Sequence, residues 1–294
     1  MRLRSVLPTG LAAVLLAGLC LLTPLPAARA ETAAAPTEAA AAGVQALSDR
    51  LMIPALFDVL REEGTAYGKT LEEEMFPGGG GPAWEATVLA IYDTAKLQAA
   101  FDAALQAELA PHPDAVAEMV AFFASERGQR IVTLEIEARR ALLDTAVDEA
   151  AQVAADKMTA ARDPRMTLIK KFAEAGDLIE MNVAGAMTGN LAFMKGLAAE
   201  GSSGAEVPEA DMMSDLWGQE DQIRTETSTW LYSYLALAYQ PLTDADLEAY
   251  IAFSESDAGR RLNAALFTAF DRVFRLVSFD LGRAAGRAML GRDI

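Results

Sequence analysis

Few residues in this chain have the types and the spacing that catalysis or metal binding requires. His112 is the only histidine and Cys20 is the only cysteine. A zinc site needs several His, Cys or carboxylate ligands, and a Ser-His-acid triad would have to use His112. His112 stands between two prolines. We therefore expect a solvated loop residue there, with a general base as the alternative.

Carboxylates are the most abundant reactive groups, as in 72–74 and in the pair Glu135 and Glu137. Two carboxylates can serve a hydrolase as acid and base or bind a hard cation. Side chains that are adjacent or two apart on a helix diverge, so we expect these to be solvated faces. The glycine run 78–81 lacks the Lys-Ser/Thr of a phosphate-binding loop and is typical of a linker. The sequence thus predicts a protein that is not an enzyme and has no metal or cofactor, with a carboxylate-based hydrolase as the weakest alternative.

The most distinctive pattern is a short phrase that occurs at 122–131 and again at 253–262, with a constant offset of 131 residues. It predicts an internal duplication. Its residue types suit a corner between two helices: a serine that caps the second helix, a glycine that allows close packing and an aromatic anchor. The residues of this repeated corner are Phe122, Ser125, Gly128 and Arg130 in the first copy and Phe253, Ser256, Gly259 and Arg261 in the second.

The two arginines of the repeated corner allow two interpretations. Arg130 and Arg261 each stand two residues beyond the glycine. They could bind an anionic ligand beside the start of a helix. We favour the alternative, in which each forms a salt bridge with a carboxylate of an adjacent helix.

The phrase resembles a stretch of the domain-of-unknown-function family 2059, which consists of exported bacterial proteins and has a pattern close to F-Y-x-S-P-x-G-Q-K. The first copy matches it well and includes Gln129, whereas the second copy has Ser254 and Arg260 at the positions of the second aromatic residue and the glutamine. Neither copy has the proline. We identify the two copies of the phrase as two tandem copies of this family. The resemblance implies export and a helical fold, and it implies no activity.

The N-terminus has the features of a secretory signal peptide at residues 1–30. Arg2 and Arg4 precede an apolar run at 11–22, and an Ala-x-Ala cleavage site ends at Ala30. The apolar run is shorter than the roughly 20 residues of a membrane span. We expect an exported, periplasmic protein without a transmembrane segment after cleavage. The alternatives are a secreted protein, or a lipid-anchored one if Cys20 is modified.

Removal of residues 1–30 takes away three arginines and no acidic residue, so the formal net charge changes from −17 to −20. Such an acidic protein is a poor match for nucleic acid. The segment that follows Ala258 is locally basic, with seven arginines against three aspartates. We expect this end to pack on the acidic remainder, and the alternative is a docking surface for an acidic partner or a lipid headgroup.

Apolar residues recur with helical spacing through the chain, and no strand-like alternation occurs. We predict an all-α protein with a disordered linker at 31–43 and two similar helical repeats, 44–162 and 163–294, packed as a bundle or short solenoid. Each repeat should contain about four helices. The predicted continuous helices include 84–109, 131–161, 165–200 and 211–239, and a last one follows Ser256.

A stretch at 181–197 mixes methionines with three glycines. Methionine suits both irregular cavities and tight packing. We favour core packing at a helix crossing, with a ligand pocket between the repeats as the alternative. The function that we expect is therefore a binding or scaffold protein for an unknown partner protein. The alternative is a carrier of a small apolar or amphipathic ligand held between the two repeats, which this stretch and the region of Trp217 and Trp230 suggest.

Overall fold

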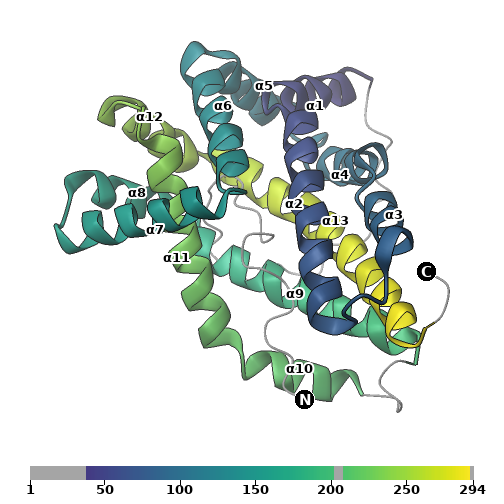
Figure 1. The fold of residues 1–294 in the computed structure, drawn as a ribbon. Coiled ribbons are helices and arrows are strands. Elements are labelled where there is room, and N and C mark those ends of the chain that lie inside the picture. Colours follow the sequence, from purple (N-terminus) through teal and green to yellow (C-terminus); the bar gives the residue numbers. More distant parts are fainter. Residues whose placement is uncertain (1–37, 202–207, 292–294) are drawn as a thin grey trace.

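The computed structural model describes residues 38–201 and 208–291, and every regular element in these residues is a helix (Figure 1). The all-α prediction is therefore confirmed. The signal peptide expected at 1–30 lies outside the described residues, as does the first part of the expected linker. Residues 38–43 of that linker form the start of the first helix, so the prediction of disorder is wrong there.

Six helices form what we call the first set, and a seventh connects them to the remainder of the chain. The first set is α1 (Glu38–Arg50), α2 (Ile53–Met75), α3 (Gly81–Ile91), α4 (Thr94–Leu109), α5 (Pro113–Ala124) and α6 (Glu126–Ala141). The connecting helix is α7 (Thr145–Ala160).

Six further helices, the second set, follow in an order of lengths that resembles the first. They are α8 (Pro164–Ala175), α9 (Leu178–Ala199), α10 (Glu209–Trp217), α11 (Glu220–Tyr239), α12 (Asp244–Ser254) and α13 (Asp257–Met289). The boundary that we expected between residues 162 and 163 falls in the turn between α7 and α8. The prediction of about four helices in each repeat is wrong, because four helices predicted as continuous are each split in two.

Three of the splits have local causes that the spacing of apolar residues does not reveal. Asp93 caps α4 by accepting a hydrogen bond from the backbone N–H of Lys96, and Asp144 caps α7 in the same way through Ala146. Both caps start a new helix within a continuous apolar pattern. The turn before α9 contains Asp177, whose φ of 47° is left-handed and cannot continue a helix.

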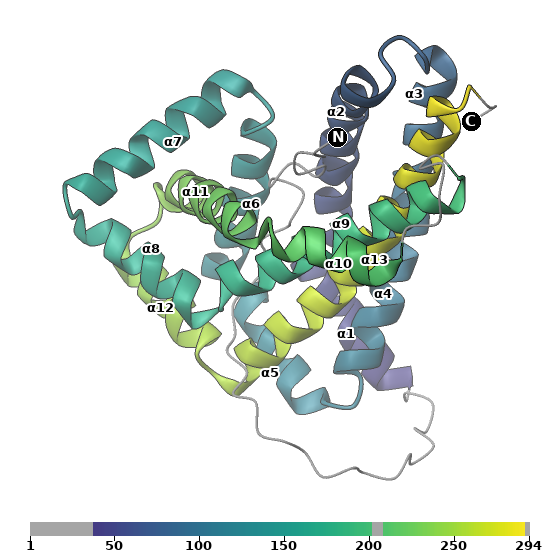
Figure 2. The ribbon, with the colours of Figure 1, turned by 90° about the horizontal axis from the view of Figure 1, so that it is seen from below.

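The two sets pack internally in a similar way, and the last helix of each also packs on the other set, which we call the exchange of last helices. The most extensive contact of α13 is still with α9 of its own set. In the first set α1 packs on α5 and α2 packs on α3 and α4; in the second set α8 packs on α12 and α9 packs on α10 and α11. The last helix of each set then packs on the fourth helix of the other, α6 on α11 and α13 on α4. Figures 1 and 2 show α7, α8, α11 and α12 together on one side of the molecule and α2, α3 and α4 on the other.

One core holds the two sets together. Most buried apolar side chains, from Val44 in α1 to Ala288 in α13, belong to a single connected cluster. Phe101 of α4 and Phe270 of α13 lie with their ring centroids 4.6 Å apart. Because the exchanged helices contribute to this shared core, the two sets form one folded body.

Candidate functional site

The closest approach between two helices brings α9 and α13 together. An ideal Cβ at Gly196 would lie 2.2 Å from the carbonyl oxygen of Phe279, and one at Gly282 would lie 2.2 Å from that of Phe193. Only glycine permits these distances. At the other end of the pair, Asn263 Nδ2 donates to the carbonyl of Gly176. The two helices therefore run parallel and side by side, and the tight crossing that we expected in 181–197 exists.

A cavity of about 270 Å³ lies between the two helices, before this crossing. Its lining is mostly apolar, and Ala184 and Thr268 are exposed lining residues, so the cavity reaches the surface there. An ideal Cβ at Gly185 would meet no atom within 4 Å, which shows that this glycine faces open space. The lining residues that the following argument uses are Met181, Asn182, Gly185, Phe267, Asp271 and Phe274.

Two polar side chains stand out in this apolar lining. Asn182 is 2% exposed, and its Nδ2 donates to the carbonyl of Leu178 while its Oδ1 has no partner among the described residues. Asp271 is paired with Arg275, one turn further along α13, with 3.0 Å between Oδ2 and Nη2. Burial nevertheless raises the pKa of the Asp271 carboxyl above its ordinary value, although Arg275 opposes this shift. Buried polar atoms without partners are uncommon in folded proteins, and two residues of this lining have one, Oδ1 of Asn182 and the hydroxyl of Tyr92.

The repeated corner has the same geometry in both copies. Ser125 Oγ accepts from the N–H of Gly128 at 3.1 Å, and Ser256 Oγ accepts from that of Gly259 at 3.0 Å. An ideal Cβ at Gly128 would lie 2.3 Å from the carbonyl oxygen of Phe122, and one at Gly259 would be closer still to that of Phe253. The two corners also touch, because the rings of Phe122 and Phe253 stack with centroids 4.1 Å apart.

The arginines of the corner have partners that differ from our expectation. Arg130 donates to the carbonyl of Pro241 at 2.7 Å, and Arg261 Nη1 lies 3.1 Å from Nε2 of His112. The expected salt bridges are wrong because each arginine points at the turn before the fifth helix of the other set, where a carbonyl and an imidazole are the available acceptors. His112 is accordingly a partly buried contact of Arg261 and not a solvated loop residue.

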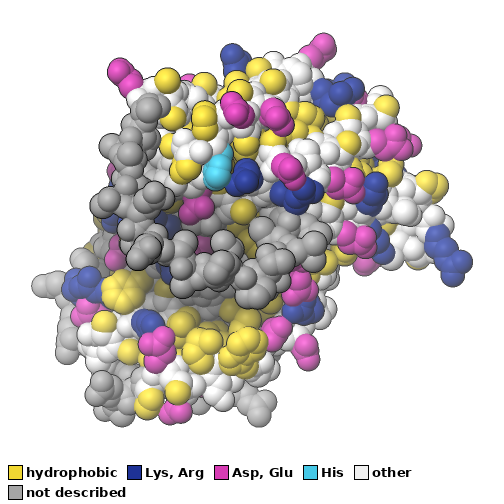
Figure 3. Space-filling model, turned by 180° about the vertical axis from the view of Figure 1, so that it is seen from behind, with side chains coloured by type: hydrophobic (Ala, Val, Ile, Leu, Met, Phe, Trp, Pro, Cys, Tyr) yellow, Lys and Arg dark blue, Asp and Glu magenta, His cyan; other side chains and the backbone are white. Residues whose placement is uncertain are grey.

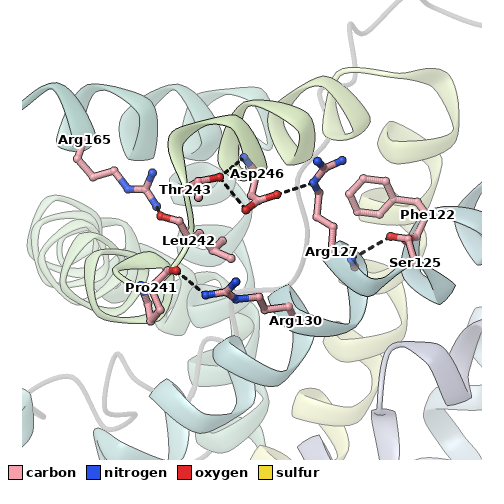
Figure 4. A network of polar contacts seen from close by, with 10 residues as sticks. Phe122, Ser125, Arg127, Arg130, Arg165, Pro241, Leu242, Thr243 and Asp246 are labelled. Carbon is pink, nitrogen blue, oxygen red and sulfur yellow. Dashed lines mark hydrogen bonds and ion pairs between the residues drawn. The ribbon is translucent and has the colours of Figure 1, made fainter.

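Two more arginines reach the turn that precedes α12 (Figure 4). Arg127 of α6 pairs with Asp246 at 2.8 Å, and Arg165 of α8 donates to the carbonyls of Tyr239 and Leu242. With Arg130, both sets therefore hold this turn. These arginines contact carboxylates and backbone carbonyls of the protein itself, which indicates a structural joint.

A buried polar cluster lies where α6 meets the second set. Glu135 Oε1 accepts from the hydroxyl of Tyr239 at 2.7 Å and from that of Tyr250 at 3.3 Å. Burial raises the pKa of the Glu135 carboxyl to about 7, although the two hydrogen bonds lower it. One turn along, Arg139 is 3% exposed and forms a bidentate pair with Glu63 of α2, at 2.6 and 2.8 Å. The expectation of a solvated face is wrong for Glu135, which lies in line with Ile131 and Arg139 on the buried side of α6.

The basic C-terminal segment packs as we expected. Arg283 and Arg287 of α13 both pair with Glu200 at the end of α9, at 3.1 and 3.2 Å. These two arginines hold the pKa of the Glu200 carboxyl below its ordinary value. Figure 3 shows acidic and basic side chains interspersed over one face of the molecule, with no continuous basic area among the described residues on that face.

The tryptophans that we associated with a ligand lie elsewhere. Trp217 ends α10 with 60% of its surface exposed, and Trp230 stacks on Tyr234. Neither lines the cavity. The cavity also lies within the second set, between α9 and α13, with only Tyr92 contributed by the first set, and not between the two repeats.

Residues 95–157 match the family described as "Uncharacterized protein conserved in bacteria (DUF2059)". The match runs from α4 into α7 and includes the first repeated corner, so it supports the family for this part of the chain. It does not extend to the second corner, and a tandem copy of the family is therefore not shown. No curated protein and no solved structure matches the chain.

Within residues 38–201 and 208–291, none of the helices combines the length and the apolar composition that crossing a membrane requires. The same residues contain no group of three or more His, Cys, Asp or Glu side chains placed to hold a metal ion.

Proposed function

We propose that this protein is a non-enzymatic binding protein that holds a small apolar or amphipathic molecule in the cavity between α9 and α13. The observation that supports it is a surface-connected cavity with an apolar lining, in which Gly185 faces open space. Ligand sites in proteins are typically concave and apolar with a few polar groups. The lining contains a single carboxylate, Asp271, and neither histidine nor cysteine, which favours binding over catalysis.

Native mass spectrometry of freshly purified protein tests the proposal. We expect a bound species that is lost when Gly185→Leu fills the cavity. Leucine also has a higher helix propensity than glycine, so the variant should unfold at an equal or higher temperature. Ala199→Leu is the matched control, because Ala199 is exposed on the same helix away from the cavity, and it should keep the bound species.

A clean mass for the unaltered protein, together with no binding of added long-chain alcohols, would contradict the proposal. A bound species that survives Gly185→Leu would place the ligand elsewhere. Loss of the bound species in Gly185→Leu supports the proposal only if this variant is as stable as the parent. The unfolding temperature tests this, because a misfolded variant would also lose binding.

We also propose that the two sets of helices arose by tandem duplication. The shared packing pairs, the exchanged last helices and the matching corners support this. Duplication predicts that the second set will match the same family model once relatives of this chain are included in that model. A second set that matches an unrelated family would contradict it.

Export to the periplasm remains a proposal that rests on the features of residues 1–30. N-terminal sequencing of the protein from a periplasmic extract should begin at Glu31. A protein that retains Met1 and fractionates with the cytoplasm would overturn this expectation.

A further inference from the structure

We propose that the cavity selects an uncharged amphiphile, an apolar chain that ends in a hydroxyl or another hydrogen-bond donor, over a fatty-acid anion. This inference rests on the proposed function, because it specifies the class of ligand for the same cavity. Three features of the lining support it: an unpartnered acceptor, a nearby negative charge and a mostly apolar wall. The other polar groups of the wall are hydroxyls, those of Tyr92, Thr188, Thr268 and Ser278.

The acceptor is the side-chain oxygen of Asn182. Its Nδ2 is fixed as the donor by the carbonyl of Leu178, so the free atom is Oδ1, which can only accept. Asn182 is 2% exposed and lines the cavity. This oxygen is itself buried beneath the lining, so the Asn182 side chain must rotate for a ligand to reach it. A buried acceptor without a partner is unfavourable, and a ligand that donates a hydrogen bond to it would remove that cost. An ether or a carboxylate has no proton to donate there.

The negative charge is the carboxylate of Asp271, which lines the same cavity from α13. Among the described residues its only ion-pair partner is Arg275, so the pair has no excess positive charge to offer an anion. A second carboxylate beside Asp271 would be repelled in these partly desolvated surroundings. Burial already raises the pKa of the Asp271 carboxyl, which indicates that this environment disfavours negative charge.

The remainder of the wall suits a hydrocarbon chain. Phe267, Phe270 and Phe274 present aromatic rings from α13, and Met181 and the open face of Gly185 lie opposite on α9. Concave sites with a mostly apolar lining are where proteins bind apolar molecules. The hydrocarbon chain of the ligand contributes binding energy through the apolar area that it buries, and the polar end of the ligand decides which amphiphile is preferred.

Isothermal titration with three matched ligands at pH 8 tests the inference: decan-1-ol, 1-methoxydecane and decanoate. Decanoate is ionised at this pH. We expect decan-1-ol to bind at least about tenfold more tightly than either of the others, because only the alcohol donates to Asn182 without adding charge.

Two variants assign the preference to its causes. Asn182→Leu should bring the alcohol and the ether to similar affinity, whereas Asn190→Leu should leave the preference intact. Asn190 is the matched control, since it is equally a buried asparagine of α9 with an unpartnered Oδ1 and does not line the cavity. Asp271→Asn should strengthen decanoate binding without changing that of the ether.

Equal affinities for the three ligands would overturn the inference and leave the proposed function standing. Tighter binding of decanoate than of decan-1-ol would do the same. If none of the three binds to the unaltered protein, the proposed function itself fails. Should Asn182→Leu not fold, the order of the three affinities in the unaltered protein and the response to Asp271→Asn still decide the question.

Discussion

The chain that follows each repeated corner differs between the two sets, and this difference lengthens one wall of the cavity. After the first corner, α6 ends at Ala141 and α7 starts again at Thr145 in a new direction. After the second corner, α13 continues without a break for 33 residues. Its later part has no counterpart in α6 and lies against α9. Two regions that begin with the same local geometry therefore end in different architecture.

The cause of the break is visible in the sequence at equivalent positions. Asp144 accepts a hydrogen bond from the N–H of Ala146 and caps α7, and the offset of 131 places Arg275 at the same position in α13. Arginine cannot serve as such a cap and is a good helix former. Arg275 instead pairs with Asp271 one turn earlier. Without a capping residue at this position α13 continues, and Phe274, Val277 and Ser278 complete the wall that Phe267, Phe270 and Asp271 begin.

The largest expected effect comes from placing a proline at two equivalent positions, 145 in the first set and 276 in the second, which differ by the offset of 131 residues. Leu276→Pro lies inside α13, where it removes a backbone hydrogen bond and clashes with the preceding turn, so it should reduce the free energy of unfolding by about 3 kcal/mol or more. Thr145→Pro lies at the first position of α7 and should change stability by less than about 0.5 kcal/mol, since proline is tolerated there. Urea denaturation measures both.

Both residues are at least partly exposed, so the contrast isolates the backbone. If the two prolines reduced the free energy of unfolding equally, this would contradict the view that the backbone starts a new helix at Thr145 and continues one helix through Leu276. Leu276→Pro should also weaken binding of an apolar ligand, and Thr145→Pro should not.

The second prediction concerns Glu135, where α6 meets the second set. Its carboxyl has a pKa of about 7 in the folded protein and the ordinary value of 4.5 when unfolded. Between these values the folded state holds a proton that the unfolded state has lost, so raising the pH destabilises the folded state. The loss should amount to about 2 kcal/mol between pH 5 and pH 8, and it reaches its full extent above pH 7.

Thermal unfolding of Glu135→Gln against the parent measures this effect. Glutamine can still accept from Tyr239 and Tyr250 but does not ionise. The difference in stability between variant and parent should therefore grow as the pH rises from 5 to 8. Parallel pH profiles would show that folding does not raise the pKa of the Glu135 carboxyl, which would contradict its desolvation between α6 and the second set.

The smallest expected effect tests whether the two corners are equivalent. Ser125→Ala and Ser256→Ala each remove one N-cap hydrogen bond, and each should cost about 1 kcal/mol in urea denaturation. We expect the two costs to agree within about 0.5 kcal/mol, because the capping distances are nearly the same. A large loss in the free energy of unfolding at one corner and none at the other would show that the two caps do not stabilise the protein equally, although their geometry is the same.

Sequence reasoning could predict the helical class and the chemistry of the corner, because capping and apolar spacing are local. It could not predict the breaks at Asp93 and Asp144, since an aspartate between apolar residues also fits an exposed position on a continuous helix. The exchange of α6 and α13 between the sets depends on contacts distant in sequence, and no local pattern encodes it.

The cavity was predictable only in part. The glycines and methionines of 181–197 indicated either tight packing or a pocket, and the structure has both, at different points of α9. Asn182 gave no such signal, because a lone polar residue on a helix is ordinarily solvated. The sequence did give a signal for Glu135, since its four-residue spacing from Ile131 and Arg139 places it on the buried side of α6.

A crystal structure of the protein soaked with 10-bromodecan-1-ol would test the ligand site most directly. We predict an anomalous bromine peak inside the cavity, between Gly185 and Phe274, with the hydroxyl within hydrogen-bonding distance of Asn182 Oδ1. Bromine density only at the protein surface or between neighbouring molecules, with the cavity empty, would contradict the proposal that α9 and α13 enclose a binding site.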